Sequence, residues 1–268
     1  MNAVLFDVAL TAYIVAAIAA VGSFVGRREQ LTRFTLLLTQ AGWICHTAAI
    51  LARGAELHRL PILTLAEVVS VVIWAAVLFE LWIERHYDIR VLGAFVLPVV
   101  LALGLALPTG LRSLAFEPQA QSGWVVVHVS LLLVGLAALV LNFGGALMYL
   151  LQDRQLKRKH PGAIYYRLPS LEALDRLTLA TLTVAFPFLT VGLALGMVSA
   201  GRAWGSRLLV DPLALFSIVM WLVYAAMLSG RALGHWRGRS AAYFAIAGFF
   251  ALLLTLGAGV LFQGRHGS

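Results

Sequence analysis

The chain has 268 residues, of which 61% are hydrophobic and 12% charged, whereas soluble domains average about 25% charged residues. This composition excludes a soluble globular domain, because one soluble core cannot enclose so many apolar side chains. The formal net charge is +8. Basic residues of multi-pass membrane proteins flank their helices on the cytoplasmic side, so we expect no nucleic-acid partner.

Several uncharged segments are long enough to cross a hydrocarbon layer of about 30 Å as helices. The first of them lacks the basic start of a signal peptide and therefore predicts a spanning helix. The predicted fold class is all-α, a polytopic membrane helix bundle that forms a single lipid-embedded domain over residues 1–268. About eight membrane helices are predicted, over residues 3–25, 34–53, 62–83, 90–108, 124–151, 176–200, 212–230 and 240–262.

Basic residues gather in alternate connections. The connections after the first, third, fifth and seventh predicted helices hold 14 of the 20 Lys and Arg residues. The positive-inside rule assigns these connections to the cytoplasm, so both termini are predicted outside. We expect a multi-pass protein of the bacterial cytoplasmic (inner) membrane. In the long inner connection 152–176, Ser170 followed by Glu172 is a capping signal that predicts a short interfacial helix.

Common catalytic motifs are absent from the sequence, which has no P-loop, no HExxH and no GxSxG. The single cysteine, Cys45, excludes an internal disulfide, a CxxC redox pair and a cysteine-rich metal site, and we interpret it as a packing residue. Gly192, Gly196 and the Gly pair at 144–145 are interpreted as close-packing positions of membrane helices. No catalytic residue is predicted from these patterns.

Seven histidines are present, and their positions divide them into two groups. Three fall in cytoplasmic connections beside basic residues and are interpreted as surface residues: His86, His160 and His235. The others map to the outer half of the protein. These four are His46, His58, His128 and His266.

His46 and His128 fall inside predicted helices, where an ionisable side chain is rare and is a functional candidate by default. The alternative for both is a histidine that hydrogen-bonds to a neighbouring helix. For His58, on a short outer connection, a plain surface role is equally open. His266 lies so close to the end of the chain that, taken alone, it indicates a frayed tail.

Histidines placed in this way are suited to haem. A neutral imidazole donates a nitrogen lone pair to a metal, and two histidines from different helices can bind haem iron from both faces. Aromatic rings pack against the macrocycle, and guanidinium groups bind its propionates. The outer side offers such side chains, so the composition permits a haem site without requiring one. They include Trp43, Trp124, Trp204, Phe216, Arg202 and Arg207.

Several stretches follow one another in a characteristic order. They are "CHTAAILARGAELHRLPILTLAEVVSVVIW", the helix start "HVSLLLVGLAAL", the inner-loop pieces "YLLQDRQLKRK" and "RLPSLEALDRL", the outer loop "WG…DP…W", the segment "GHWRGRSAAYFAIAGFF" and the ending "GVLFQGRHGS". In this order, over residues from about 40 to 268, the chain resembles the cytochrome c assembly family of haem-handling membrane proteins, the CcsA/ResC-like and HemX-like group.

The resemblance implies a helical membrane fold with a haem site at the outer face, in which His128 and His266 are the axial metal ligands. On this hypothesis the haem is b-type and bound without a covalent link. The other candidate cofactor-binding residues have assigned roles. Trp204 and Phe216 cover the macrocycle, Arg202 or Arg207 pairs with propionates, Asp211 orients a histidine or an arginine, and His46 and His58 are further candidates.

The outer loop departs from the family pattern Trp-Gly-x-x-Trp-x-Trp-Asp-Pro-Lys-Glu. Leu208 and Val210 stand where two tryptophans are expected, and Leu213 and Ala214 replace Lys and Glu. Ser229 falls where the family has a membrane histidine. These departures weaken the expectation of an inner haem site and of haem presentation to apocytochrome, and they resemble a shorter, divergent branch of the family.

Three functions follow from these patterns. The first is a haem-binding protein that handles haem in cytochrome c biogenesis or haem metabolism without bond-making catalysis, with a second assembly subunit or an apocytochrome as partner. The second is a membrane scaffold or regulatory subunit of the same family that has lost haem transfer. The third is a small-solute transporter, although the few charges in the helices, chiefly Asp7, Glu67 and Glu80, form no recognisable polar path.

Overall fold

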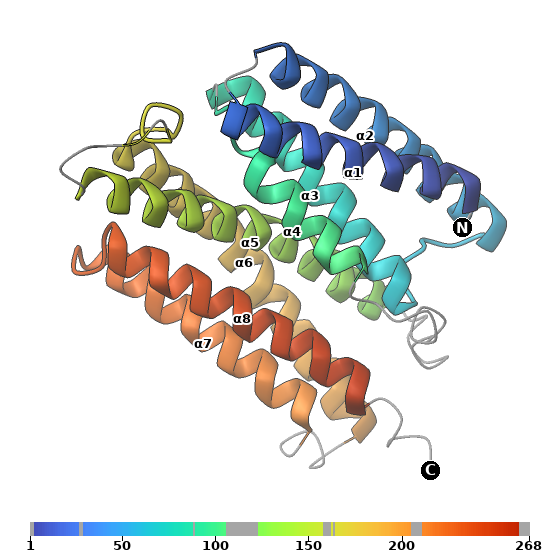
Figure 1. Ribbon diagram of the computed structural model, residues 1–268. Coiled ribbons are helices and arrows are strands. Elements are labelled where there is room, and N and C mark those ends of the chain that lie inside the picture. Colours follow the sequence, from blue (N-terminus) through green and yellow to red (C-terminus); the bar gives the residue numbers. More distant parts are fainter. Residues whose placement is uncertain are drawn as a thin grey trace. The chain divides into compact units, whose positions relative to one another are not determined.

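The computed structural model describes residues 3–26, 29–87, 89–105, 123–157, 162, 164–204 and 211–262, and these residues form helices and their connecting turns (Figure 1). The predicted all-α membrane fold is confirmed. The helices are α1 (Ala3–Gly26), α2 (Glu29–Leu57), α3 (Leu65–Tyr87), α4 (Gly93–Leu105), α5 (Gly123–Leu156), α6 (Leu171–Trp204), α7 (Pro212–Ala232) and α8 (Arg239–Phe262).

Seven of the described helices are long and apolar enough to cross a membrane, and α4 is the shorter apolar one. With 13 residues, α4 extends about 20 Å, which is less than the hydrocarbon thickness of about 30 Å. The fourth predicted span, residues 90–108, therefore has a shorter helix at its centre, and its last residues lie outside the described part of the chain. The placement of both termini outside stays a prediction.

Two helices, α2 and α6, differ from the predicted bounds in an instructive way. The helix α2 is longer at both ends than the predicted 34–53, because polar residues beyond the hydrocarbon can continue a helix in water. The predicted interfacial helix after Ser170 is wrong as a separate element. The Ser170 hydroxyl accepts the Ala173 N–H at 3.2 Å and caps α6 itself, which runs unbroken from Leu171.

The chain divides into two compact units. Unit 1 comprises residues 1–116 and 150–174, and unit 2 comprises residues 117–149 and 175–268. In unit 1, α1 packs along α2 and α4, while α3 packs against α2 and α4. In unit 2, α7 and α8 pack along one another. The prediction of a single membrane domain over residues 1–268 stays a prediction.

Close approach between helices uses glycine in both units. A Cβ at Gly42 of α2 would lie 3.0 Å from the Tyr13 ring of α1, and a Cβ at Gly145 of α5 would lie 3.1 Å from the Thr178 methyl of α6. Aromatic stacking adds to this packing in unit 2, where the rings of Phe143 and Phe249 lie 4.1 Å apart. Within each unit, the helices are therefore held together by close packing, as in membrane helix bundles generally.

Candidate functional site

His128 lies in the second turn of α5, half-buried against α6 of the same unit. Its Nδ1 is 2.5 Å from the carbonyl oxygen of Gly192. One turn further along α6, Gly196 lies directly beneath the ring, where a Cβ would come within 2.4 Å of the His128 Cε1. The predicted role of Gly192 and Gly196 as packing positions is confirmed: Gly196 packs under this histidine, and Gly192 packs against Leu132 of α5.

The contact with Gly192 determines which nitrogen of His128 carries the proton. A carbonyl oxygen can only accept a hydrogen bond, so Nδ1–H must be the donor. The neutral ring then has its lone pair on Nε2, the nitrogen that commonly binds a metal. A hydrogen bond that fixes the other ring nitrogen is the usual support of a metal-binding histidine. His128 therefore fits the chemistry of an axial haem ligand.

The other members of the predicted outer haem site are described only in part. Arg202 and Trp204 belong to the last turn of α6, but their side chains lie outside the described residues, as do Arg207 and His266 in full. The structure thus neither brings His128 and His266 together nor separates them, and this pairing stays a prediction. The same holds for a haem propionate contact with either arginine.

Asp211 and Phe216 are described at the start of α7. The buried Asp211 caps this helix, because its Oδ1 accepts the Ala214 N–H at 3.0 Å and Pro212 follows in the first turn. This contact gives Asp211 a structural role beside the predicted orienting role, which stays untested. Phe216 is 36% exposed, so its ring is available for contact with a ligand or with lipid.

His46 lies in the core of unit 1 and is only 1% exposed. Its Nε2 is 2.8 Å from the Ser70 hydroxyl, and its Nδ1 is 3.4 Å from the Tyr13 hydroxyl. The rings of Phe6 and Tyr13 meet it edge to face. Both ring nitrogens thus have hydroxyl partners, and this geometry favours the alternative of a hydrogen-bonded core histidine over a haem contact.

His58 is exposed and ends α2 with a positive φ of 51°, a left-handed conformation typical of helix C-termini. Beside it, the nearly buried Glu67 of α3 binds two arginines, with Arg53 Nε at 3.5 Å and Arg59 Nη1 at 3.2 Å. The same carboxylate accepts the Leu63 N–H at 2.9 Å and the Thr64 N–H at 3.1 Å. His58 directly precedes Arg59, an arginine of this ion cluster, in the sequence.

The Glu67 cluster was missed from the sequence, although a signal was present. Thr64 Oγ1 accepts the Glu67 N–H at 3.2 Å while Glu67 accepts the Thr64 N–H, which is a reciprocal capping box at the start of α3. The pattern Thr-x-x-Glu before the apolar run predicts this arrangement. The pairing with two arginines depends on the path of the chain between α2 and α3, which no local pattern gives.

The candidate tryptophans Trp43 and Trp124, and Trp221 of the resembling outer segment, lie in different environments. In unit 1, Trp43 stacks on Trp74 with ring centroids 5.5 Å apart, and its Nε1 donates to the Trp74 carbonyl at 3.2 Å. Trp124, at the first turn of α5, is 63% exposed. Trp221 of α7 donates from Nε1 to Thr190 Oγ1 at 2.9 Å. Trp43 and Trp221 thus join helices, whereas Trp124 offers an open ring.

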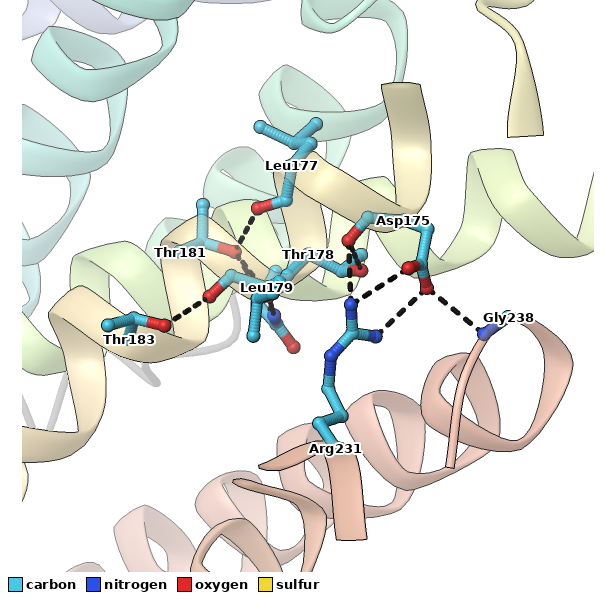
Figure 2. Close-up of polar contacts among 9 residues, drawn as sticks. Asp175, Leu177, Thr178, Leu179, Thr181, Thr183, Arg231 and Gly238 are labelled. Atoms are coloured by element: carbon cyan, nitrogen blue, oxygen red, sulfur yellow. Dashed lines mark hydrogen bonds and ion pairs between the residues drawn. The ribbon is translucent and has the colours of Figure 1, made fainter. Parts of the chain in front are cut away.

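A second ion cluster lies in unit 2, where α6 meets α7 and the turn before α8 (Figure 2). The buried Arg231 binds the Asp175 carboxylate with both terminal nitrogens, at 2.9 and 3.0 Å, and Nη2 also donates to the Asp175 carbonyl at 3.0 Å. The Gly238 N–H donates to Asp175 Oδ1 at 3.0 Å. This cluster joins α6, α7 and the turn before α8 at one point. From the sequence, its arginine is assigned to a basic connection.

Comparison with known proteins shows similarity along most of the chain. Residues 62–266 match a family described as cytochrome C assembly protein. The cytochrome c biogenesis protein CcsA of Synechococcus sp. (strain CC9605) is 32% identical over 257 residues, which are 86% of this chain and 84% of the relative. CcsA of Parasynechococcus marenigrum (strain WH8102) is 32% identical over 88% of this chain and 86% of the relative. CcsA of Guillardia theta is 29% identical over 83% and 81%.

Proposed function

Because the chain belongs to the cytochrome c assembly protein family, we propose that it binds and handles haem in cytochrome c biogenesis. Haem would be its cargo, held without a covalent link near the outer face of a bacterial cytoplasmic membrane. The supporting observation is the geometry of His128, whose Nδ1 donates to Gly192 and whose Nε2 therefore carries the lone pair. A histidine held in this way is ready to bind iron.

His128 would supply one axial ligand, and His266 the other. In the same proposal Trp204 and Phe216 cover the macrocycle, while Arg202 or Arg207 binds a propionate. Haem iron needs two such nitrogen ligands to be held in a six-coordinate state. The chain would bind, orient and release haem, and an apocytochrome or a second assembly subunit would be the receiving partner.

The absorption spectrum of the purified protein tests this proposal. We expect protein expressed with added haem to show a Soret band and sharp reduced α and β bands. Both His128→Ala and His266→Ala should weaken these bands, and the double variant should remove them, because the ligands act on opposite faces of one iron. Exposed His235, in the turn before α8, provides the control, and His235→Ala should leave the spectrum unchanged.

Ligand rescue separates loss of a ligand from loss of the fold. Added imidazole should restore low-spin bands to His128→Ala, because it can occupy the vacated coordination position. Wild-type protein without haem-dependent absorbance at any loading would contradict haem binding and favour a scaffold or regulatory subunit, for which the replaced loop residues Leu208 and Val210 already argue. An unchanged spectrum in the double variant would contradict the ligand assignment alone.

A further inference from the structure

Glu80 is a buried carboxyl group in the membrane-spanning helix α3, and it has no role in the proposed haem site. Its side chain is 1% exposed, and its Oε2 has no hydrogen-bond partner among the described residues. Glu84 follows one helical turn later on the same face of α3 and is half-buried. An ionisable group at such a position is costly and is therefore a functional candidate.

The start of α4 approaches this pair of carboxyls. Gly93, the first residue of α4, lies so close to Glu80 that a Cβ at this position would be 2.6 Å from Glu80 Oε1. The Gly93 N–H donates to Glu84. It has no helical acceptor of its own, because the first N–H groups of a helix are unpaired within the helix. The positive end of α4 thus faces the two carboxyls.

These contacts balance one negative charge at the pair. Glu84 is the less costly of the two carboxyls to ionise, because it is less completely buried than Glu80 and because the Gly93 N–H, the α4 N-terminus and Arg90 offset part of the cost of burying its charge. Glu80 has no described arginine, lysine or histidine in ion-pair contact, and α4 itself carries no ionisable side chain. The ionisable groups that interact electrostatically with Glu80 are Glu84 and Tyr13 of α1, neither of which supplies a positive charge. A second buried anion one turn from the first would add like-charge repulsion to the cost of desolvation.

We propose that Glu80 and Glu84 form a proton-binding site within the membrane, in which Glu80 carries the proton as a neutral acid and Glu84 is the carboxylate. The proton can pass from the Glu80 hydroxyl to the Glu84 carboxylate and from there to water at the α3–α4 turn, and it returns by the same two groups. Atoms and charge balance, because the pair alternates between one bound proton and none. This site is independent of the proposed haem function.

Carbodiimide labelling tests the site, because dicyclohexylcarbodiimide reacts with protonated carboxyls in apolar surroundings. We expect mass spectrometry of the labelled, membrane-embedded full chain to find the adduct at Glu80, with labelling that falls as the pH is raised. Glu80→Gln should abolish the adduct. Glu67 is also buried in the same helix but is bound by two arginines, so it is the internal control and should remain unlabelled.

The Glu84→Gln variant examines the coupling between the two groups. Removal of the neighbouring anion makes ionisation of Glu80 easier, so labelling of Glu80 should be lost at a lower pH than in the wild type. An unchanged labelling profile would contradict the shared site. Protection of Glu80 by sodium chloride, but not by choline chloride, would also contradict the proposal and indicate a sodium ion in place of the proton.

Infrared spectroscopy of the wild-type protein avoids dependence on any variant. A neutral carboxylic acid in apolar surroundings has a carbonyl stretch separate from those of carboxylates, and this band shifts in D₂O. We expect such a band in the wild type and its loss in Glu80→Gln. Absence of the band, or equal carbodiimide labelling of Glu80 and Glu67, would overturn the proposal. None of these readouts involves haem, so they are independent of the outcome at His128.

Discussion

Arg231 in unit 2 and Glu80 in unit 1 are both buried ionisable groups in membrane helices, but their surroundings are opposite. Arg231 has a bidentate carboxylate partner in Asp175 and a further bond to its carbonyl. Glu80 has a second carboxyl, Glu84, one turn away, and its Oε2 has no partner among the described residues. Burial alone therefore does not distinguish a structural ionisable group from a functional one. The distinction depends on whether the group has a partner of opposite charge.

The helix α3 repeats this contrast within one element. Glu67, at its first turn, is bound by Arg53, Arg59 and two backbone N–H groups. Glu80, further along the same helix, faces the backbone of Gly93. The same residue type in the same helix thus serves as a fixed ion-pair centre at one end and as an exchangeable acid at the other. Substitutions at these positions should separate the two roles.

The largest effect is expected at the paired arginine. Arg231→Ala leaves the Asp175 carboxylate without its counter-charge. Because the Asp175 side chain is 27% exposed, the cost in the free energy of unfolding should lie toward the lower end of the about 3–5 kcal/mol that loss of one member of a buried pair costs. Denaturant unfolding in detergent, followed by tryptophan fluorescence, measures this change. Arg239→Ala, at an exposed arginine near the start of α8, is the matched control and should cost far less. Equal losses in the two variants would contradict a structural role for the pair.

Glu67→Gln should have the next largest effect. The amide keeps the shape of the side chain but removes the charge that binds Arg53 and Arg59, and hydrogen bonds to a charged group contribute about 1.5–3 kcal/mol each. Thermal unfolding in detergent provides the measurement. Glu56→Gln is the control, because Glu56 also binds Arg53 but has a side chain that is 51% exposed, and it should shift the midpoint little. A larger shift for Glu56 would show that the cluster is not centred on Glu67.

Gly196→Ala tests the close, uncharged contact between Gly196 and the His128 ring. A Cβ 2.4 Å from the His128 ring must displace the ring, and overpacking of this kind costs about 1–3 kcal/mol. The same displacement should weaken the Soret band of haem-loaded protein. Gly257→Ala, where a Cβ would meet nothing within 4 Å, should preserve both stability and spectrum. A normal spectrum in Gly196→Ala would argue against His128 as a ligand.

The smallest effect is expected at Glu80. Because an amide matches a neutral carboxylic acid in shape, Glu80→Gln should change the free energy of unfolding by less than about 1 kcal/mol, well below the cost of leaving a buried charge unpaired. Denaturant unfolding under the conditions used for Arg231→Ala makes the comparison direct. A loss as large as that of Arg231→Ala would contradict the contrast between the two groups.

Local patterns in the sequence were sufficient to predict the helices. The apolar segments predicted all eight, with most ends within a few residues of those observed, because a membrane helix satisfies its own backbone hydrogen bonds and needs little help from other segments. The capping role of Ser170 was also visible locally, although the helix that it starts is α6 rather than a separate element. The basic connections and the two histidines within predicted helices, His46 and His128, were equally readable as features of single stretches.

Tertiary structure alone decided which polar side chains pair between helices. His46 and Ser70, Asp175 and Arg231, and His128 and Gly192 are pairs from different helices, and no period in the sequence links their members. His46 and His128 are alike in sequence as histidines within membrane helices, yet the first has two hydroxyl partners and the second has a carbonyl at one nitrogen. Whether a segment forms a membrane helix depends on its own apolar residues, so the sequence of that segment predicts it. The partners of a side chain depend on how neighbouring helices pack, and no single segment contains that information.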